Sequence, residues 1–216
     1  MENYIEAKNN ITKNQDKGDF CILNYENEDT RKLGEKCPAQ VLYFSSARRL
    51  EEGVFLEGEE IYLARNKKTE RLMSIHEMQL VGICNVENVM AAVLIAEAME
   101  IPRAEYLEVI RTFRAVEHRI EFVREVNGVA YYNDSKGTNP DAAVQAIYAM
   151  SRPTVLIGGG YDKGSLYDEW IEAFAGKVKF LVLIGQTREK IAACAKAHGF
   201  EDFVFAESFQ EAFEIC

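Results

Sequence analysis

The chain has 216 residues, of which 48% are hydrophobic and 28% charged, and its formal net charge is −10. An acidic chain without a basic patch argues against nucleic acid as a main partner, and the apolar runs are too short for a membrane span. The length suits one large domain or two small ones with a sizeable core.

Cysteine and histidine usage predicts a cytoplasmic protein with reduced thiols and no metal site. The five cysteines are odd in number and widely spaced, without a Cys-x-x-Cys pair. The three histidines, His76, His118 and His198, have no metal-ligand spacing. Residues 1–4 lack the basic and apolar stretches of a secretory signal.

The first half predicts a βαβ-like unit followed by an antiparallel meander at a sheet edge. A long helix is expected after Gly82, with Asn85 as its cap, ending before Pro102. The other expected elements are a helix at 2–14, strands at 20–24, 41–44, 53–56, 60–64 and 71–75, a short helix after the acidic turn at 26–29, and a helix at 104–112.

The second half alternates buried strands with amphipathic helices, which indicates an α/β fold with a parallel, doubly wound sheet. A domain boundary near residue 115 gives domains at 1–115 and 116–216. The expected elements are a hairpin at 120–126 and 129–133, strands at 154–157, 178–184 and 203–205, and helices at 141–150, 165–174, 187–198 and from 209 onwards. The chain stops inside a helix at Cys216, which predicts a truncated piece of a longer protein.

A polar stretch from Tyr131 to Asp141 joins a predicted strand to a predicted helix. Asn139 suits the helix cap and Pro140 the first helical position. Asp134 and Lys136 lie between strand and helix, where open α/β sheets bind ligands. The stretch is either a polar loop with an ordinary cap or part of a ligand site.

A glycine run at 157–164 follows another buried strand but is neither a Walker A loop nor Gly-x-Gly-x-x-Gly. It is either a structural glycine turn or a turn from which Lys163 reaches an anion. Because this loop and the Asp134 loop follow successive strands of one predicted sheet, we expect them to be close.

Two further motifs have a structural and a functional interpretation. Glu117-His118-Arg119, near the domain boundary, is either a surface charge cluster or a phosphate clamp. Asn85 and Asn88, one helical turn apart, are either a cap and a solvated amide or a pair that reads the edge of a base.

Four motifs occur in the order in which the Mur ligase family carries them, and the chain resembles that family over most of residues 80–165. The run Asp134-Ser135-Lys136-Gly137-Thr138-Asn139 is the specific one, since it resembles the members that add D-glutamate, whereas sister ligases typically have Asp-Tyr-Ala-His. The motifs are Gly82-x-x-Asn85-x-x-Asn88, Glu117-His118-Arg119, Asn133 to Asn139, and Gly158-Gly159-Gly160-x-Asp162-Lys163-Gly164.

The resemblance implies the C-terminal part of a central ATP-binding α/β domain at 1–115, followed by a truncated Rossmann-like, D-glutamate-binding domain at 116–216. It implies a cytoplasmic, ATP-dependent ligase of peptidoglycan synthesis. Such an enzyme adds D-glutamate to UDP-N-acetylmuramoyl-L-alanine through an acyl phosphate, with ATP and Mg²⁺ and without nucleic acid or a membrane as partner.

The resemblance also implies roles for eight side chains. The nucleotide-binding residues would be Asn85, Asn88, Arg119 and Asp134. The catalytic residues would be Lys136 and His118. The residues that hold D-glutamate would be Thr138 and Lys163. Phosphoryl transfer depends mostly on positioning and charge neutralisation, which suits these side chains.

The chain departs from the family pattern at its P-loop, which is missing, and at Cys84, where the family often has His. The family's metal-binding His and modified Lys would lie upstream of residue 1. We therefore expect an inactive fragment whose Mg²⁺ ligands are mostly elsewhere. The alternatives are a related amide ligase such as a folylpolyglutamate synthase, or a non-catalytic nucleotide-binding module.

Overall fold

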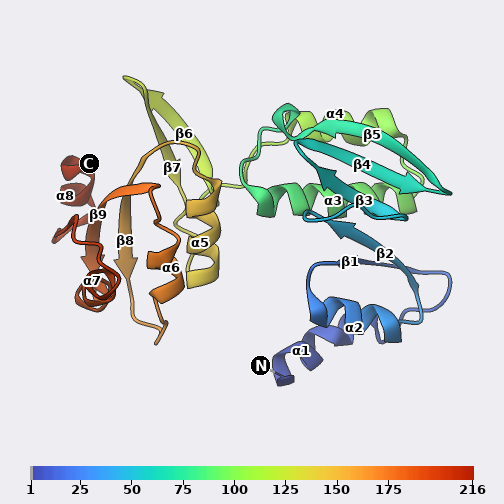
Figure 1. The fold of residues 1–216 in the computed structure, drawn as a ribbon, viewed down its shortest axis with the longest axis horizontal. Coiled ribbons are helices and arrows are strands. Elements are labelled where there is room, and N and C mark those ends of the chain that lie inside the picture. Colours follow the sequence, from blue (N-terminus) through green and yellow to red (C-terminus); the bar gives the residue numbers. More distant parts are fainter. Residues whose placement is uncertain (1) are drawn as a thin grey trace. The chain divides into compact units, whose positions relative to one another are not determined.

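The computed structural model describes residues 2–216, and Met1 lies outside the described part. The chain divides into two compact units, one ending at Arg114 and the other beginning at Ala115 (Figure 1). Each unit has its own buried core. The two units are described separately.

Unit 1 contains a five-stranded mixed sheet in the order β1-β2-β3-β4-β5. The first three strands pair in parallel and the last three antiparallel, which confirms the predicted βαβ-like start and edge meander. The strands are β1 (Phe20–Asn24), β2 (Gln40–Ser45), β3 (Gly53–Glu57), β4 (Glu60–Arg65) and β5 (Lys68–Ser74). The helices are α1 (Glu2–Asn9), α2 (Glu28–Lys36), α3 (Ile83–Ala98) and α4 (Arg103–Thr112), with 3₁₀ turns at Asn10–Thr12 and Ile75–Glu77.

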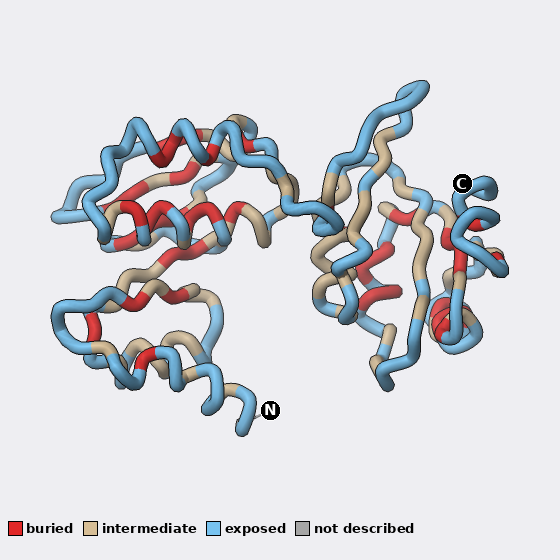
Figure 2. The backbone as a smooth tube through the Cα atoms, turned by 180° about the vertical axis from the view of Figure 1, so that it is seen from behind, coloured by how far each residue is buried: buried red, intermediate tan, exposed pale blue. Residues whose placement is uncertain are grey.

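Alternation along β1 sends side chains to two different cores. Ile22 packs against the large core that α3 and α4 build on one face of the sheet. Cys21 and Leu23 pack with Leu33 of α2 in a smaller core. Figure 2 shows buried residues running along α3 and the strands beside it.

Unit 2 contains a three-stranded parallel sheet in the order β10-β9-β8, with helices on both faces. Leu181 and Leu183 of β9 belong to the core shared with α5, α6 and α7, whereas Val182 packs with Ala212 of α8. The elements are β6 (Glu121–Val126), β7 (Val129–Asn133), α5 (Pro140–Ala149), β8 (Thr154–Gly160), α6 (Asp168–Glu172), β9 (Val178–Gly185), α7 (Arg188–Ala197), β10 (Phe203–Phe205) and α8 (Phe209–Ile215). The α/β fold class is confirmed.

The hairpin β6–β7 turns at Asn127-Gly128, where both residues have positive φ angles, as predicted for an Asn-Gly turn. The prediction that β7 and β8 share one sheet is wrong, because β6 and β7 form a separate two-stranded sheet. A register shift between Phe122 and Arg124 accompanies this separation. Side chains link the hairpin to the segment before β8, since Arg152 donates to Glu125 and to the Gly128 carbonyl.

Four predicted elements differ in extent by three residues or more, among them the strand expected at 71–75, which is β5 (Lys68–Ser74). The helix expected at 2–14 ends at Asn9 and continues only as a 3₁₀ turn to Thr12. The helix expected at 165–174 is α-helical only over Asp168–Glu172. Gly158, Gly159 and Gly160, expected in a turn, lie instead in β8 and pair with Leu183–Gly185, whereas Gly164 lies in the loop after β8. A Cβ on Gly159 would lie 2.0 Å from the Ile184 carbonyl oxygen, so only glycine permits this close pairing.

Candidate active site

The segment before β6 and the loop after β7 are tied together at the open end of the hairpin. The N–H of Lys136 donates to the carbonyl of His118 at 2.9 Å, and the N–H of Ile120 donates to Oδ1 of Asp134 at 2.9 Å. His118 and Ile120 have φ angles of 69° and 47°, which non-glycine residues rarely adopt. We call residues 118–120 and 133–139 the hairpin-end cluster. It unites five of the eight predicted site residues.

The Asn133 amide orients the His118 ring. Its Oδ1 accepts the N–H of Ser135 at 3.1 Å, which leaves Nδ2 facing His118 Nδ1 at 2.8 Å. Because Nδ1 accepts this bond, the neutral ring carries its proton on Nε2. Glu121, which sequence analysis did not select, accepts the His118 N–H at 2.8 Å. The exposed edge of His118 is therefore a hydrogen-bond donor.

Asp134 lies half-buried beneath its loop. Burial raises the pKa of its carboxyl, partly offset by the N–H of Ile120 and the charge of Arg119. Gly137 makes room for this carboxyl, because a Cβ there would lie 2.3 Å from Asp134 Oδ2. The N–H of Gly137 also donates to the Asp134 carbonyl at 2.8 Å. The loop thus holds the carboxyl in place by close packing.

Lys136 and Thr138 are exposed at the top of the same loop. Their backbones form a tight turn in which the Thr138 N–H donates to the Lys136 carbonyl at 2.9 Å. Asn139 then caps α5, accepting the Ala142 N–H at 2.8 Å, with Pro140 at the first helical position, as predicted. The Lys136 and Thr138 side chains are therefore accessible to solvent.

Lys163 lies in the loop between β8 and α6, and is exposed. Its neighbour Asp162 accepts the Gly164 N–H at 2.8 Å and lies 3.4 Å from Nζ of Lys190, a partner that sequence analysis missed. Within residues 115–216 no hydrogen bond or ion pair joins Lys163 to the hairpin-end cluster. We expected the Lys163 loop and the Asp134 loop to be close because β7 and β8 would share one sheet, but these strands belong to different sheets.

Asn85 and Asn88 lie on α3 in unit 1. The expectation that Asn85 caps this helix is wrong, since Gly82 is the cap, with a φ of 89°, and the helix begins at Ile83. Asn85 instead donates from Nδ2 to the Val81 carbonyl at 2.8 Å. Asn88 Nδ2 is 3.5 Å from Asn85 Oδ1, so the two amides share one side of the helix, as predicted.

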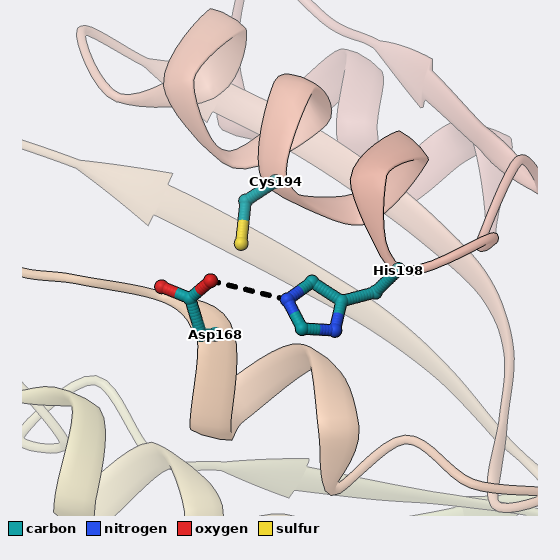
Figure 3. A group of neighbouring side chains, drawn as sticks. All are labelled: Asp168, Cys194 and His198. Carbon is teal, nitrogen blue, oxygen red and sulfur yellow. Dashed lines mark hydrogen bonds and ion pairs between the residues drawn. The ribbon is translucent and has the colours of Figure 1, made fainter.

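A second polar group lies on α6 and α7 and was missed in the sequence. Asp168, Cys194 and His198 bring one ligand atom each to within 4.8 Å of one another (Figure 3). Sequence analysis selected none of these three side chains as a possible metal ligand. The available signal was Cys-x-x-x-His, which puts Cys194 and His198 on one helical face. Burial, and then the charge of Asp168, raise the pKa of the Cys194 thiol.

Both units match domains of one family of ligases. The family described as "Mur ligase middle domain" matches residues 1–96, and the one described as "Mur ligase, glutamate ligase domain" matches residues 118–216. The chain belongs to the Mur ligase family.

Curated relatives make the similarity more specific. The chain is 54% identical over its full length to the UDP-N-acetylmuramoylalanine–D-glutamate ligase of Lachnoclostridium phytofermentans, of which it covers 48%. It is 45% identical to the ligase of the same name from Clostridioides difficile, over 98% of this chain and 47% of that protein. The chain thus spans about half the length of the curated relatives it matches.

Solved structures share the fold. The UDP-N-acetylmuramate–alanine ligase of Thermotoga maritima matches with a TM-score of 0.70 at 17% identity, covering 99% of this chain and 48% of that one. The folylpolyglutamate synthase of the same organism matches with a TM-score of 0.64 at 17% identity, covering 100% and 52%. None of the helices in residues 2–216 combines the length and apolarity needed to span a bilayer.

Proposed function

We propose that this chain is part of an ATP-dependent ligase that adds D-glutamate to UDP-N-acetylmuramoyl-L-alanine. The reaction would proceed through an acyl phosphate and would belong to peptidoglycan synthesis in the cytoplasm. The names of the relatives support the substrate pair. The observation that carries the proposal is the hairpin-end cluster, which gathers a carboxyl, an ammonium, a hydroxyl and an imidazole donor on one constrained loop pair.

The domain roles follow from the same proposal. Residues 1–115 would complete the ATP-binding domain, with Asn85 and Asn88 presenting their amides to adenine. Residues 116–216 would bind D-glutamate. The two amides are linked to each other, and Asn85 is anchored on the Val81 carbonyl, which limits their freedom before a base arrives.

Within the hairpin-end cluster, Arg119 and Asp134 would hold the phosphate and ribose side of ATP. Lys136 and His118 would be the catalytic residues, placing an ammonium and an Nε2–H donor beside the negative charge of the acyl phosphate. Thr138 would hold D-glutamate together with Lys163, whose exposed ammonium has no ion-pair partner in residues 115–216.

The proposed reaction requires Mg²⁺, which takes oxygen ligands in octahedral geometry. Among the described residues, the one group with three potential ligands contains a thiol and does not fit this ion. No step is therefore assigned to Mg²⁺ through residues of this chain.

The test compares a longer protein containing this sequence and a P-loop with the 216-residue chain. The longer protein should release phosphate only when ATP, UDP-N-acetylmuramoyl-L-alanine and D-glutamate are all present. The 216-residue chain should not, because it lacks the P-loop amides and lysine. Turnover by the repurified short chain would contradict its predicted inactivity.

A folylpolyglutamate synthase activity is the second candidate, supported by fold similarity alone. The same protein assayed with a folate and L-glutamate separates the two. Activity with folate and none with the muramoyl substrate would overturn the proposal. Nucleotide binding by the 216-residue chain itself, without turnover of either substrate, would instead support the non-catalytic module.

A further inference from the structure

We propose that Asp168, Cys194 and His198 form a binding site for a transition-metal cation of the zinc type, separate from the hairpin-end cluster. The three side chains come from two packed helices, with Asp168 at the start of α6, Cys194 on α7, and His198 directly after α7. Figure 3 shows the carboxylate, the thiol and the imidazole pointing toward a common point.

The ligand atoms are already near the spacing that a metal requires. Tetrahedral zinc bonds of about 2.0–2.3 Å place neighbouring ligand atoms roughly 3.3–3.7 Å apart. Nε2 of His198 lies 3.1 Å from Oδ1 of Asp168, and all three ligand atoms lie within 4.8 Å of one another. Small rotations of the Cys194 and Asp168 side chains would therefore close the site around an ion.

A carboxylate behind the imidazole completes the arrangement. Nδ1 of His198 lies 3.7 Å from Oε1 of Glu172, on the ring edge opposite the one that faces Asp168. Metal-ligating histidines commonly direct their second nitrogen to a carboxylate, which fixes the tautomer and the ring orientation. Glu172 would orient His198 in this way, leaving Nε2 free for the ion and a fourth position for water.

The ligand set selects the class of ion. A thiolate with an imidazole favours zinc, cobalt or copper over magnesium and calcium, which prefer oxygen. On binding, Cys194 releases its proton to solvent, and the ion replaces the hydrogen bond between His198 and Asp168. The side chain of Asp168 is 60% exposed, so an ion has a path from solvent.

Metal binding would join α6 to α7 beside the loop that carries Lys163. Asp168 begins α6 four residues after Gly164, and Lys190 of α7 already contacts Asp162 on the other side of this loop. The Lys190–Asp162 contact joins α7 to the start of this loop, and the bound ion would join α7 to α6 at the end of the loop. The site would therefore stabilise the β8–α6 connection without taking part in the chemistry of the hairpin-end cluster.

The test uses Co²⁺ as a spectroscopic probe with the full 216-residue chain, prepared reduced and metal-free. Wild type should bind one Co²⁺ with a thiolate-to-cobalt charge-transfer band, which Zn²⁺ abolishes. Cys194→Ser should lose the band, and Cys216→Ser, a change at an exposed thiol outside the site, should keep it. Glu172→Gln should keep the band but bind about 10- to 100-fold more weakly.

Circular dichroism without metal shows whether each variant is folded. Should Cys194→Ser fail to fold, Asp168→Asn and His198→Gln test the same site, and each should weaken Co²⁺ binding at least tenfold. A band that survives Cys194→Ser, or one lost only in Cys21→Ser, would place the metal elsewhere. Absence of a band in folded wild type, with no rise of Tm on adding Zn²⁺, would show that the three side chains form only an ion pair and would overturn the proposal.

Discussion

The side-chain amide nitrogen of Asn133 lies 2.8 Å from Nδ1 of His118, joining the last residue of β7 to the segment before β6. The opposite end of the amide is fixed by the N–H of Ser135. The contact therefore fixes both the position of the loop and the tautomer of the ring.

Replacing Asn133 by Ala should remove the preference of the His118 ring for one tautomer. In wild type, nitrogen NMR of neutral His118 should show the proton mainly on Nε2, and in Asn133→Ala a mixture of the two tautomers, because Nδ1 loses its donor. His76 and His198, measured in the same spectra, are internal controls that should not change. An unchanged His118 pattern in the variant would show that another group sets the tautomer.

Gly137→Ala should displace the Asp134 carboxyl, because the new Cβ would lie 2.3 Å from Oδ2. In a longer protein with a P-loop, we expect weaker ATP binding while the fold is retained. Ser135→Ala is the matched control, since it changes an exposed side chain of the same loop. Calorimetric titration measures the ATP affinity of both variants. Equal affinities would show that Asp134 does not contribute to nucleotide binding.

Asn139→Ala should lower the free energy of unfolding by about 0.5–2 kcal/mol, because it removes the side-chain cap of α5. Ser208→Ala removes the corresponding cap of α8, where Ser208 Oγ accepts the Glu211 N–H at 3.1 Å. Ser208→Ala should lower the free energy of unfolding by a similar amount. Urea denaturation of the 216-residue chain measures both. If Ser208→Ala lowers the free energy of unfolding and Asn139→Ala does not, Pro140 alone is sufficient to start α5.

Local patterns in the sequence were sufficient for most elements. The cap and proline at 139–140 and the Asn127-Gly128 turn depend on neighbouring residues, and each is found where predicted. The strand was predicted to end at residue 157 because glycine usually ends a strand. In the structure the strand continues to Gly160, because the glycines allow close pairing with β9.

The candidate site was predictable in composition but not in arrangement. His118 and Asp134 were selected from their motifs, yet the bonds between the two segments depend on positive φ angles at non-glycine residues, which sequence does not reveal. Asp168 and His198 are thirty residues apart and meet only because α6 packs on α7. Long-range pairing of this kind leaves no local signal.

Asp134→Asn should alter the pH dependence of stability. Burial raises the pKa of Asp134 above its ordinary value of 3.8, so the folded state favours the protonated carboxyl. Wild type therefore loses stability as pH rises from 3.8 through the raised folded pKa, whereas the amide does not titrate. Urea denaturation across this range should show the free energy of unfolding of the variant rising relative to that of wild type. Above the raised folded pKa the difference between the two should stay constant. Parallel pH curves would mean that burial does not perturb this carboxyl.

Lys163→Met should selectively weaken the use of D-glutamate by a longer, P-loop-containing protein. Met keeps most of the stem of this exposed side chain and deletes its charge, so packing is preserved. A charged hydrogen bond is worth about 1.5–3 kcal/mol, or roughly 10- to 150-fold in kcat/KM. The loss should appear when D-glutamate is varied and be much smaller in acyl-phosphate formation without it. Lys179→Met, at another exposed lysine of unit 2, should leave both steps unchanged.

Loss of acyl-phosphate formation with an unchanged KM for D-glutamate would assign Lys163 to the phosphate site. If neither step changes, Lys163 has no role in either step and the glycine-rich segment before it is structural.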